Sequence, residues 1–128
     1  VYRAATEHVG DWWNAEHSWS GDAKNLSLDA RPGGCFCERL PGGGVQHMTV
    51  VYADAGKLLR LQGGLGPLQA MAVTGTWSWT FTEANGVTTL EATYVVGGYA
   101  KGGLAGLATV VDQVTGEQMR RLKAYAER

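Results

Sequence analysis

The sequence predicts a single α+β domain in which an antiparallel sheet of about six strands packs against one long C-terminal helix. In the central part of the chain, apolar and polar residues alternate between turn signals, most clearly over residues 74–96. Over residues 103–128, apolar residues instead recur three and four positions apart, which is typical of one face of a helix. A chain of 128 residues has the size of one domain, so residues 1–128 are expected to share one core.

The N-terminal segment is expected to be helical. Residues 1–13, VYRAATEHVGDWW, carry apolar side chains at near-helical spacing, and Gly10 interrupts them, which predicts one or two short helices. The polar segment 14–25 reads as a loop, and the alternating LSLDA that follows at 26–30 predicts the first visible strand.

A glycine-rich hairpin is predicted next. The segments CFCERL and VQHMTVVYA flank PGGG, and pairing Leu40 with Val45 around this turn places Glu38 directly opposite His47. A turn and the strand LLRLQGG follow. The apolar segment LGPLQAM is punctuated by Gly and Pro, so it is expected to be a loop that either covers part of the core or forms the rim of a pocket.

The strongest local signal is the hairpin around Asn85-Gly86, a preferred pair for a tight type I′ turn. A single register places the apolar residues of both strands on one face, and a slip by one residue would turn them toward water. The predicted partners are Ala84 with Val87, Phe81 with Leu90, Trp79 with Ala92, and Trp77 with Tyr94. Gly97-Gly98 is expected to end the second strand.

The C-terminal segment predicts a long amphipathic helix over residues 103–128. Thr115 and Gln118 stand three positions apart, as the two members of an N-terminal capping box do, and Gly116 lowers helix propensity between them. A kink or a restart is therefore expected near the middle of this helix.

The charge balance and the motifs exclude several functional classes. Eleven Lys and Arg residues stand against twelve Asp and Glu residues, so no overall charge favours nucleic acid or an anionic membrane. No apolar run approaches the roughly 18 to 20 residues that span a bilayer. The glycine clusters match neither a phosphate-binding P-loop nor a dinucleotide-binding fingerprint, so no nucleotide cofactor is expected.

The two cysteines, Cys35 and Cys37, stand two positions apart in a predicted strand. Regular strand geometry separates their backbones by about 7 Å, which disfavours a disulfide between them. Two free thiols fit a reducing compartment, so a cytoplasmic location is expected. These cysteines and His47 give only three ligands where structural zinc takes four, so no metal site is expected.

Several motifs in order resemble one known superfamily. DWW, RPGGCFCERLPGGGVQHM, DAGKLLRL, GLAGLATVVDQV and RLKAYAE together resemble the START-like, or SRPBCC, superfamily, in the branch of bacterial proteins similar to activators of the ninety-kilodalton heat-shock protein's ATPase. The resemblance implies the helix-grip fold, in which a curved antiparallel sheet wraps around the C-terminal helix and leaves an apolar cavity between them.

The chain departs from that pattern at its start. The family usually begins with a strand, whereas the residues from Val1 to Arg3 look like the start of the first helix, so the usual first strand is expected to be absent from these residues. A neighbouring strand would then carry unpaired backbone groups, which an unrecorded segment or a partner chain could cover. A monomer or a homodimer is expected.

Two side-chain groups are candidates for function. The aromatic row of Trp77, Trp79 and Tyr94 either packs fully on the C-terminal helix or, at its inner part, borders the cavity that the resemblance implies. The Glu38–His47 pair either shuttles protons, with Glu38 orienting His47, or merely satisfies its own hydrogen bonds. Trp13 and Trp19 are candidates for capping the entrance.

The leading hypothesis is a small-molecule binding protein that holds a hydrophobic or aromatic ligand between the sheet and the C-terminal helix. The residues expected to contact this ligand are Phe36, Glu38, His47, Trp77, Trp79, Tyr94, Leu107 and Val111. The second hypothesis is an enzyme of cyclase, dehydratase or hydrolase type that acts on a bound aromatic, polyketide-like compound through Glu38 and His47. The third, from the resemblance alone, is a module that stimulates a chaperone ATPase.

Overall fold

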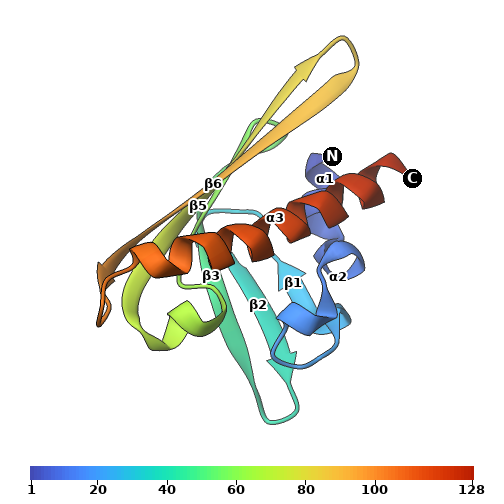
Figure 1. The fold of residues 1–128 in the computed structure, drawn as a ribbon. Coiled ribbons are helices and arrows are strands. Elements are labelled where there is room, and N and C mark those ends of the chain that lie inside the picture. The colour runs from blue at the N-terminus through green and yellow to red at the C-terminus, as the bar shows by residue number, and fades with distance from the viewer.

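The computed structural model describes residues 1–128 and shows the α+β architecture that the sequence predicts (Figure 1). The six strands are β1 (Leu26–Leu28), β2 (Cys35–Leu40), β3 (Gly43–Asp54), β4 (Leu58–Gln62), β5 (Ala72–Ala84) and β6 (Val87–Tyr99). The α-helices are α1 (Tyr2–Glu7), α2 (Val9–Trp12) and α3 (Ala105–Glu127). Short 3-10 helices span Ala15–His17, Ala23–Asn25 and Gly66–Ala70, all three in segments predicted to be loops.

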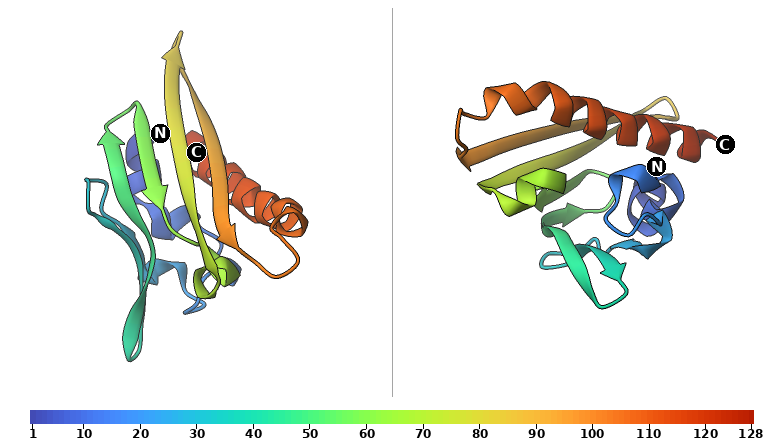
Figure 2. Two further views of the ribbon diagram at one scale, coloured as in Figure 1. Left: turned by 90° about the vertical axis from the view of Figure 1, so that its left-hand side faces the viewer. Right: turned by 60° about the horizontal axis from the view of Figure 1, so that its bottom comes forward.

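The sheet is an antiparallel meander. Its spatial order follows the chain from β1 to β6, so every strand pairs only with its neighbours in sequence. The open edges are therefore the three-residue β1 and the thirteen-residue β6. Helix α1 begins at Tyr2, the second residue of the chain. This arrangement of sheet and C-terminal helix is compatible with a helix-grip fold (Figure 2).

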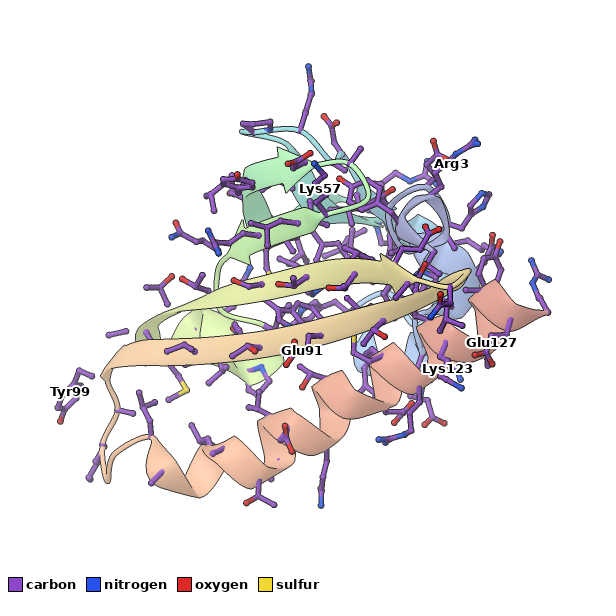
Figure 3. The ribbon with its side chains drawn as sticks, turned by 90° about the horizontal axis from the view of Figure 1, so that it is seen from above. Arg3, Lys57, Glu91, Tyr99, Lys123 and Glu127 are labelled. Atoms are coloured by element: carbon purple, nitrogen blue, oxygen red, sulfur yellow. A yellow bond between two sulfur atoms is a disulfide. The ribbon has the colours of Figure 1, made fainter.

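The β5–β6 hairpin has the predicted register along its whole predicted length. Ala84 pairs with Val87 and Trp77 pairs with Tyr94, and Asn85 and Gly86 both have positive φ, 55° and 78°, as a type I′ turn requires. The strand does not end at Gly97-Gly98, however, because β6 continues to Tyr99 at the far end of the hairpin (Figure 3). β6 can continue past this point because residue 98 is a glycine. Any larger residue would bring its Cβ into overlap with the carbonyl oxygen of Ala72 on β5.

The β2–β3 hairpin corrects the predicted register by two residues. Leu40 pairs with Gly43, so only Pro41 and Gly42 form the turn, and Glu38 lies opposite Val45 instead of His47. The prediction treated all of PGGG as a loop, whereas the last two of its glycines belong to β3. A β-bulge then leaves His47 without a ladder partner, and the consecutive side chains of His47 and Met48 are both buried.

The bulge also overturns the prediction of two free thiols. The register shifts between Phe36 and Cys37, the Cα atoms of Cys35 and Cys37 lie only 5.4 Å apart, and the two cysteines form a disulfide. Regular strand geometry would have held them farther apart, outside the usual disulfide range. The inference of a reducing compartment loses its basis with this correction.

Helix α3 is continuous over its 23 residues, so the expected kink is absent. Thr115 does not cap a new helix, because its Oγ1 donates a hydrogen bond of 2.8 Å to the carbonyl oxygen of Val111 one turn earlier. Lys123 and Glu127 form an exposed ion pair of 3.0 Å near the C-terminal end (Figure 3). No helix of the protein combines the length and the apolarity needed to cross a bilayer.

The core lies between the sheet and the N-terminal helices. Trp12 and Trp13 of the N-terminal segment meet Trp79 and Trp77 of β5 edge-on at centroid distances of 6.3 Å each. The C-terminal half of α3 closes this core with Leu122, which is 1% exposed. The N-terminal half of α3 has no buried residue, and it is here that the sheet and the helix leave room between them.

Candidate functional site

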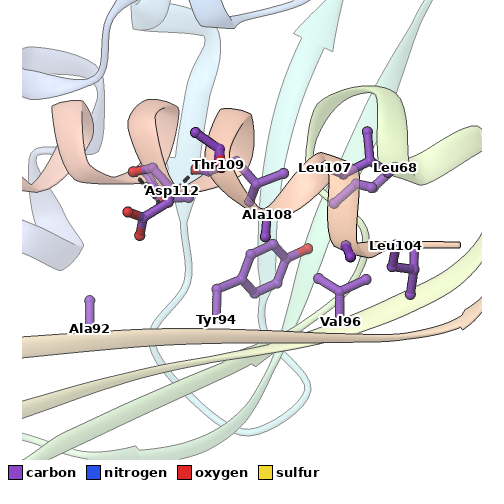
Figure 4. A pocket seen from close by; sticks show the side chains of 12 residues that line it. Leu68, Ala92, Tyr94, Val96, Leu104, Leu107, Ala108, Thr109 and Asp112 are labelled. Carbon is purple, nitrogen blue, oxygen red and sulfur yellow. Dashed lines mark hydrogen bonds between the residues drawn. The ribbon is translucent and has the colours of Figure 1, made fainter.

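A cavity of about 570 Å³ lies between β6 and the first half of α3 (Figure 4). Nine of its twelve lining residues are hydrophobic, and they come from β6, α3 and the 3-10 helix Gly66–Ala70. Tyr94 and Val96 rise from β6 toward α3, where Ala108 faces them (Figure 4). An apolar hollow between two secondary-structure layers is the usual form of a small-molecule site.

A second chamber of about 300 Å³ lies beside the first. Val111 and Thr115 of α3 line both, so the two hollows meet along one face of that helix. The other lining residues are Trp13, Glu16, His17, Ser18, Trp19, His47, Leu65, Gly66, Pro67, Val110 and Val114. The segment LGPLQAM has both of the roles considered from the sequence, because Leu68 is buried while Leu65 and Pro67 form part of the chamber wall.

Tyr94 is held in the cavity wall by a glycine and a loop. Its ring lies over Gly75 of β5, where a Cβ would overlap the ring and would stand 2.7 Å from Cζ. Its hydroxyl donates to the carbonyl oxygen of Gly63 at 2.7 Å and accepts from the backbone N–H of Leu65 at 3.1 Å. Desolvation raises the pKa of Tyr94, and the Leu65 N–H offsets this only in part, so the side chain is a neutral phenol at neutral pH.

Glu38 and His47 are in contact, as predicted, although the register that predicted the contact is wrong. Nε2 of His47 lies 2.8 Å from Oε1 of Glu38, and the two residues are 7% and 2% exposed. The β-bulge explains how the two side chains meet without backbone pairing. It turns His47 onto the buried face of the sheet, where its side chain lies beside Glu38.

The Glu38 carboxylate accepts hydrogen bonds at both of its oxygens. It accepts from the backbone N–H groups of Trp19 at 3.1 Å and Ser20 at 2.6 Å in addition to His47. Burial raises the pKa of Glu38, but the hydrogen bonds from Ser20, Trp19 and His47 outweigh burial and hold it below its usual value. Glu38 is therefore ionised at neutral pH and ties the segment 18–22 to the sheet.

The predicted site residues fall into two groups. Tyr94 and Leu107 line the larger cavity, His47 lines the smaller chamber and Val111 lines both. The other four, Phe36, Glu38, Trp77 and Trp79, are buried and line neither hollow.

The aromatic row thus divides between core and cavity. Trp77 lies 5.0 Å from Trp79 and 6.0 Å from Tyr94 between ring centroids, so Trp77 backs the cavity wall that Tyr94 forms. Trp13 is buried and lines the smaller chamber, whereas Trp19 is 55% exposed at its wall. Thr115 also lines both hollows but was not predicted as a site residue, because its spacing to Gln118 indicated a capping box.

No group of three His, Cys, Asp or Glu side chains is arranged to hold a metal ion.

Comparisons of the chain with protein families, with curated proteins and with solved structures found no match.

Proposed function

We propose that the protein binds a hydrophobic or aromatic small molecule between β6 and α3. The observation that supports this proposal is the cavity of about 570 Å³ with nine hydrophobic residues among its twelve lining residues. The hollow is open to solvent on one side, because Ala105, Ala108 and Asp112 in its wall are exposed. A concave, mostly apolar cleft between two layers of secondary structure is the usual form of a small-molecule site.

The second chamber supports the same function. It adds about 300 Å³ on the other side of Val111 and Thr115, so a ligand longer than one ring system can extend along α3. Membership of the START-like superfamily, which the sequence motifs suggest and with which the fold is compatible, is part of this proposal.

The proposal is tested by titrating the ligand-free protein with 1-anilinonaphthalene-8-sulfonate, a saturated fatty acid and a set of naphthalenes while following tryptophan fluorescence. Val111→Phe fills space in both hollows, so this variant should bind the probes at least tenfold more weakly than the wild type. Val95→Phe is the matched control, because Val95 is 65% exposed on β6 and lines neither hollow.

Two outcomes would contradict the proposal. One is an absence of saturable binding by any of these probes in a folded wild-type protein. The other is equal weakening of binding in Val111→Phe and Val95→Phe, which would place the bound probe outside the cavity.

A second candidate function is an enzyme that acts on a bound aromatic compound, with His47 as a general base. The supporting observation is the Glu38–His47 hydrogen bond at the wall of the smaller chamber. Glu38 itself is sealed from that chamber, so its role would be to orient His47. The test is mass spectrometry of each binding probe after incubation with the wild type and with His47→Gln. A product formed by the wild type alone supports the enzyme, and unchanged probes in both samples contradict it for those compounds.

A further inference from the structure

One polar atom in the wall of the smaller chamber has no partner. His47 uses Nε2 for its hydrogen bond to Glu38, and Nδ1 makes no hydrogen bond within the chain. Two side-chain atoms are fully enclosed without a hydrogen-bond partner, Nε1 of Trp79 and Nε2 of Gln118. Nδ1 of His47 is not one of them, so it keeps some accessible surface. The residue that carries this atom is 7% exposed and lines the smaller chamber, so a molecule in that chamber is the partner that Nδ1 could meet.

Other polar groups near this position are already engaged. The indole N–H of Trp13 donates to the carbonyl oxygen of His17 at 3.0 Å, and the hydroxyl of Ser18 donates to Ala15 at 2.6 Å. Thr115 donates to the carbonyl oxygen of Val111. Glu16 and His17 also line this chamber, but both are exposed to solvent. His47 is thus the buried side chain whose free polar atom a ligand would meet there.

The contact to Glu38 decides which kind of ligand atom fits. An ionised carboxylate can only accept hydrogen bonds, so the proton between the two side chains belongs to Nε2 of His47. In the neutral imidazole, Nδ1 then carries the lone pair and acts as an acceptor. The partner it requires is a hydrogen-bond donor.

The charges around both hollows disfavour an anionic ligand. Neither set of lining residues contains Lys or Arg, whereas Glu16 borders the smaller chamber and Asp112 borders the larger one. Near the middle of α3, Oε1 of Glu117 lies 3.5 Å from Nε2 of His17, which lines the smaller chamber. A carboxylate or a phosphate would enter against these negative charges with no Lys or Arg to meet it, and His17 already has Glu117 as its partner.

We propose that the ligand is a neutral, largely apolar molecule with a hydroxyl group that donates a hydrogen bond to Nδ1 of His47. This inference rests on the proposed binding function and specifies its ligand class. The hydroxyl lies in the smaller chamber, and the apolar body extends past Val111 toward the larger cavity.

The test compares three naphthalenes on the wild-type protein at neutral pH by isothermal titration calorimetry. 2-Naphthol carries the donor, 2-methoxynaphthalene has the donor blocked, and 2-naphthoate is anionic. One hydrogen bond to a buried acceptor contributes about 1.4 kcal/mol, so 2-naphthol should bind about tenfold more tightly than 2-methoxynaphthalene. 2-Naphthoate should bind most weakly.

Two variants locate the effect. His47→Phe should bind 2-naphthol and 2-methoxynaphthalene equally well, with the affinity for the methoxy compound within about threefold of the wild-type value. His47→Gln should keep part of the preference, since its amide oxygen can accept from the hydroxyl.

The outcomes separate this inference from the binding function. Equal binding of the three compounds, or tightest binding of 2-naphthoate, overturns the hydroxyl proposal while binding itself stands. A preference for 2-naphthol that survives in His47→Phe overturns the role of His47. The inference alone is overturned if none of the three compounds binds while 1-anilinonaphthalene-8-sulfonate still binds and Val111→Phe weakens that binding. Failure of that probe, of the saturated fatty acid and of the other naphthalenes as well overturns the binding function with it.

Discussion

Nε2 of His47 lies 2.8 Å from Oε1 of Glu38, although the two residues are not partners in the β2–β3 ladder. A bulge in β3 creates this contact, and the same carboxylate holds the backbone N–H groups of Trp19 and Ser20. One buried anion therefore fixes both the imidazole at the chamber wall and the loop that carries Trp19 beside it. The arrangement links the stability of the domain to the shape of its candidate site.

Glu38→Gln should lower the free energy of unfolding by about 2–4 kcal/mol, measured by urea denaturation. The amide keeps the shape of the side chain, but its NH₂ group would face donors where the carboxylate accepts from Trp19, Ser20 and His47. Glu91→Gln is the matched control on exposed β6 and should change stability by less than about 0.5 kcal/mol. Equal losses in the two variants would contradict the structural role of Glu38.

The lowered pKa of Glu38 predicts a dependence of stability on pH. Hydrogen bonds hold the folded-state pKa below the unfolded value of about 4.3, so the folded state favours the ionised form. The resulting stabilisation is present above the unfolded pKa and is lost as pH falls through the folded pKa.

The test subtracts the stability of Glu38→Gln from that of the wild type at each pH between about 7 and 3. This difference should shrink toward acid pH, because protonation of Glu38 removes its stabilising effect from the wild type. The pKa values of Asp11 and Glu117 are also lowered, but both residues are present in the two proteins and their contributions cancel. A difference that stays constant over this range would show that ionisation of Glu38 does not contribute.

The Cys35–Cys37 disulfide should stabilise the domain only weakly. The two residues are two positions apart, so the cross-link closes a very short loop and removes little entropy from the unfolded chain, about 1.5 kcal/mol in the chain-entropy description. Replacement of both cysteines by serine should therefore leave a folded protein with a modestly lower free energy of unfolding. Thiol titration of the unreduced, denatured wild type checks the pairing, and two reactive thiols there would contradict it.

The β5–β6 hairpin shows where sequence reasoning succeeds. Asn85-Gly86 favours a type I′ turn, and the alternation of apolar and polar residues in both flanking strands is satisfied by one register only. The pairing of Trp77 with Tyr94 could therefore be predicted residue by residue. Both signals are local and agree with each other. The fold class could be predicted for the same reason. Apolar residues recur at every second position in the strands and at every third or fourth position in α3.

The β2–β3 hairpin shows where it fails. Consecutive glycines fit either a turn or a strand, and no residue in the sequence identifies His47 as the extra residue of a bulge. The Glu38–His47 contact was predicted through a register that does not occur, and the disulfide was missed for the same reason. Which aromatic residues border the cavity depends on how far α3 stands from β6, a distance set by packing across the whole domain.

A final prediction concerns Gly75, whose bare Cα allows the ring of Tyr94 to lie across β5 toward the loop at Gly63. Gly75→Ala should cost about 1–3 kcal/mol of stability, because its methyl group would overlap the ring. In a Tyr94→Ala background the same substitution should cost little, whereas in Tyr94→Phe, which keeps the ring without the hydroxyl, the cost should persist. Urea denaturation of the variants in this double-mutant cycle measures the coupling. An equal cost of Gly75→Ala in all three backgrounds would show that the ring does not depend on the glycine.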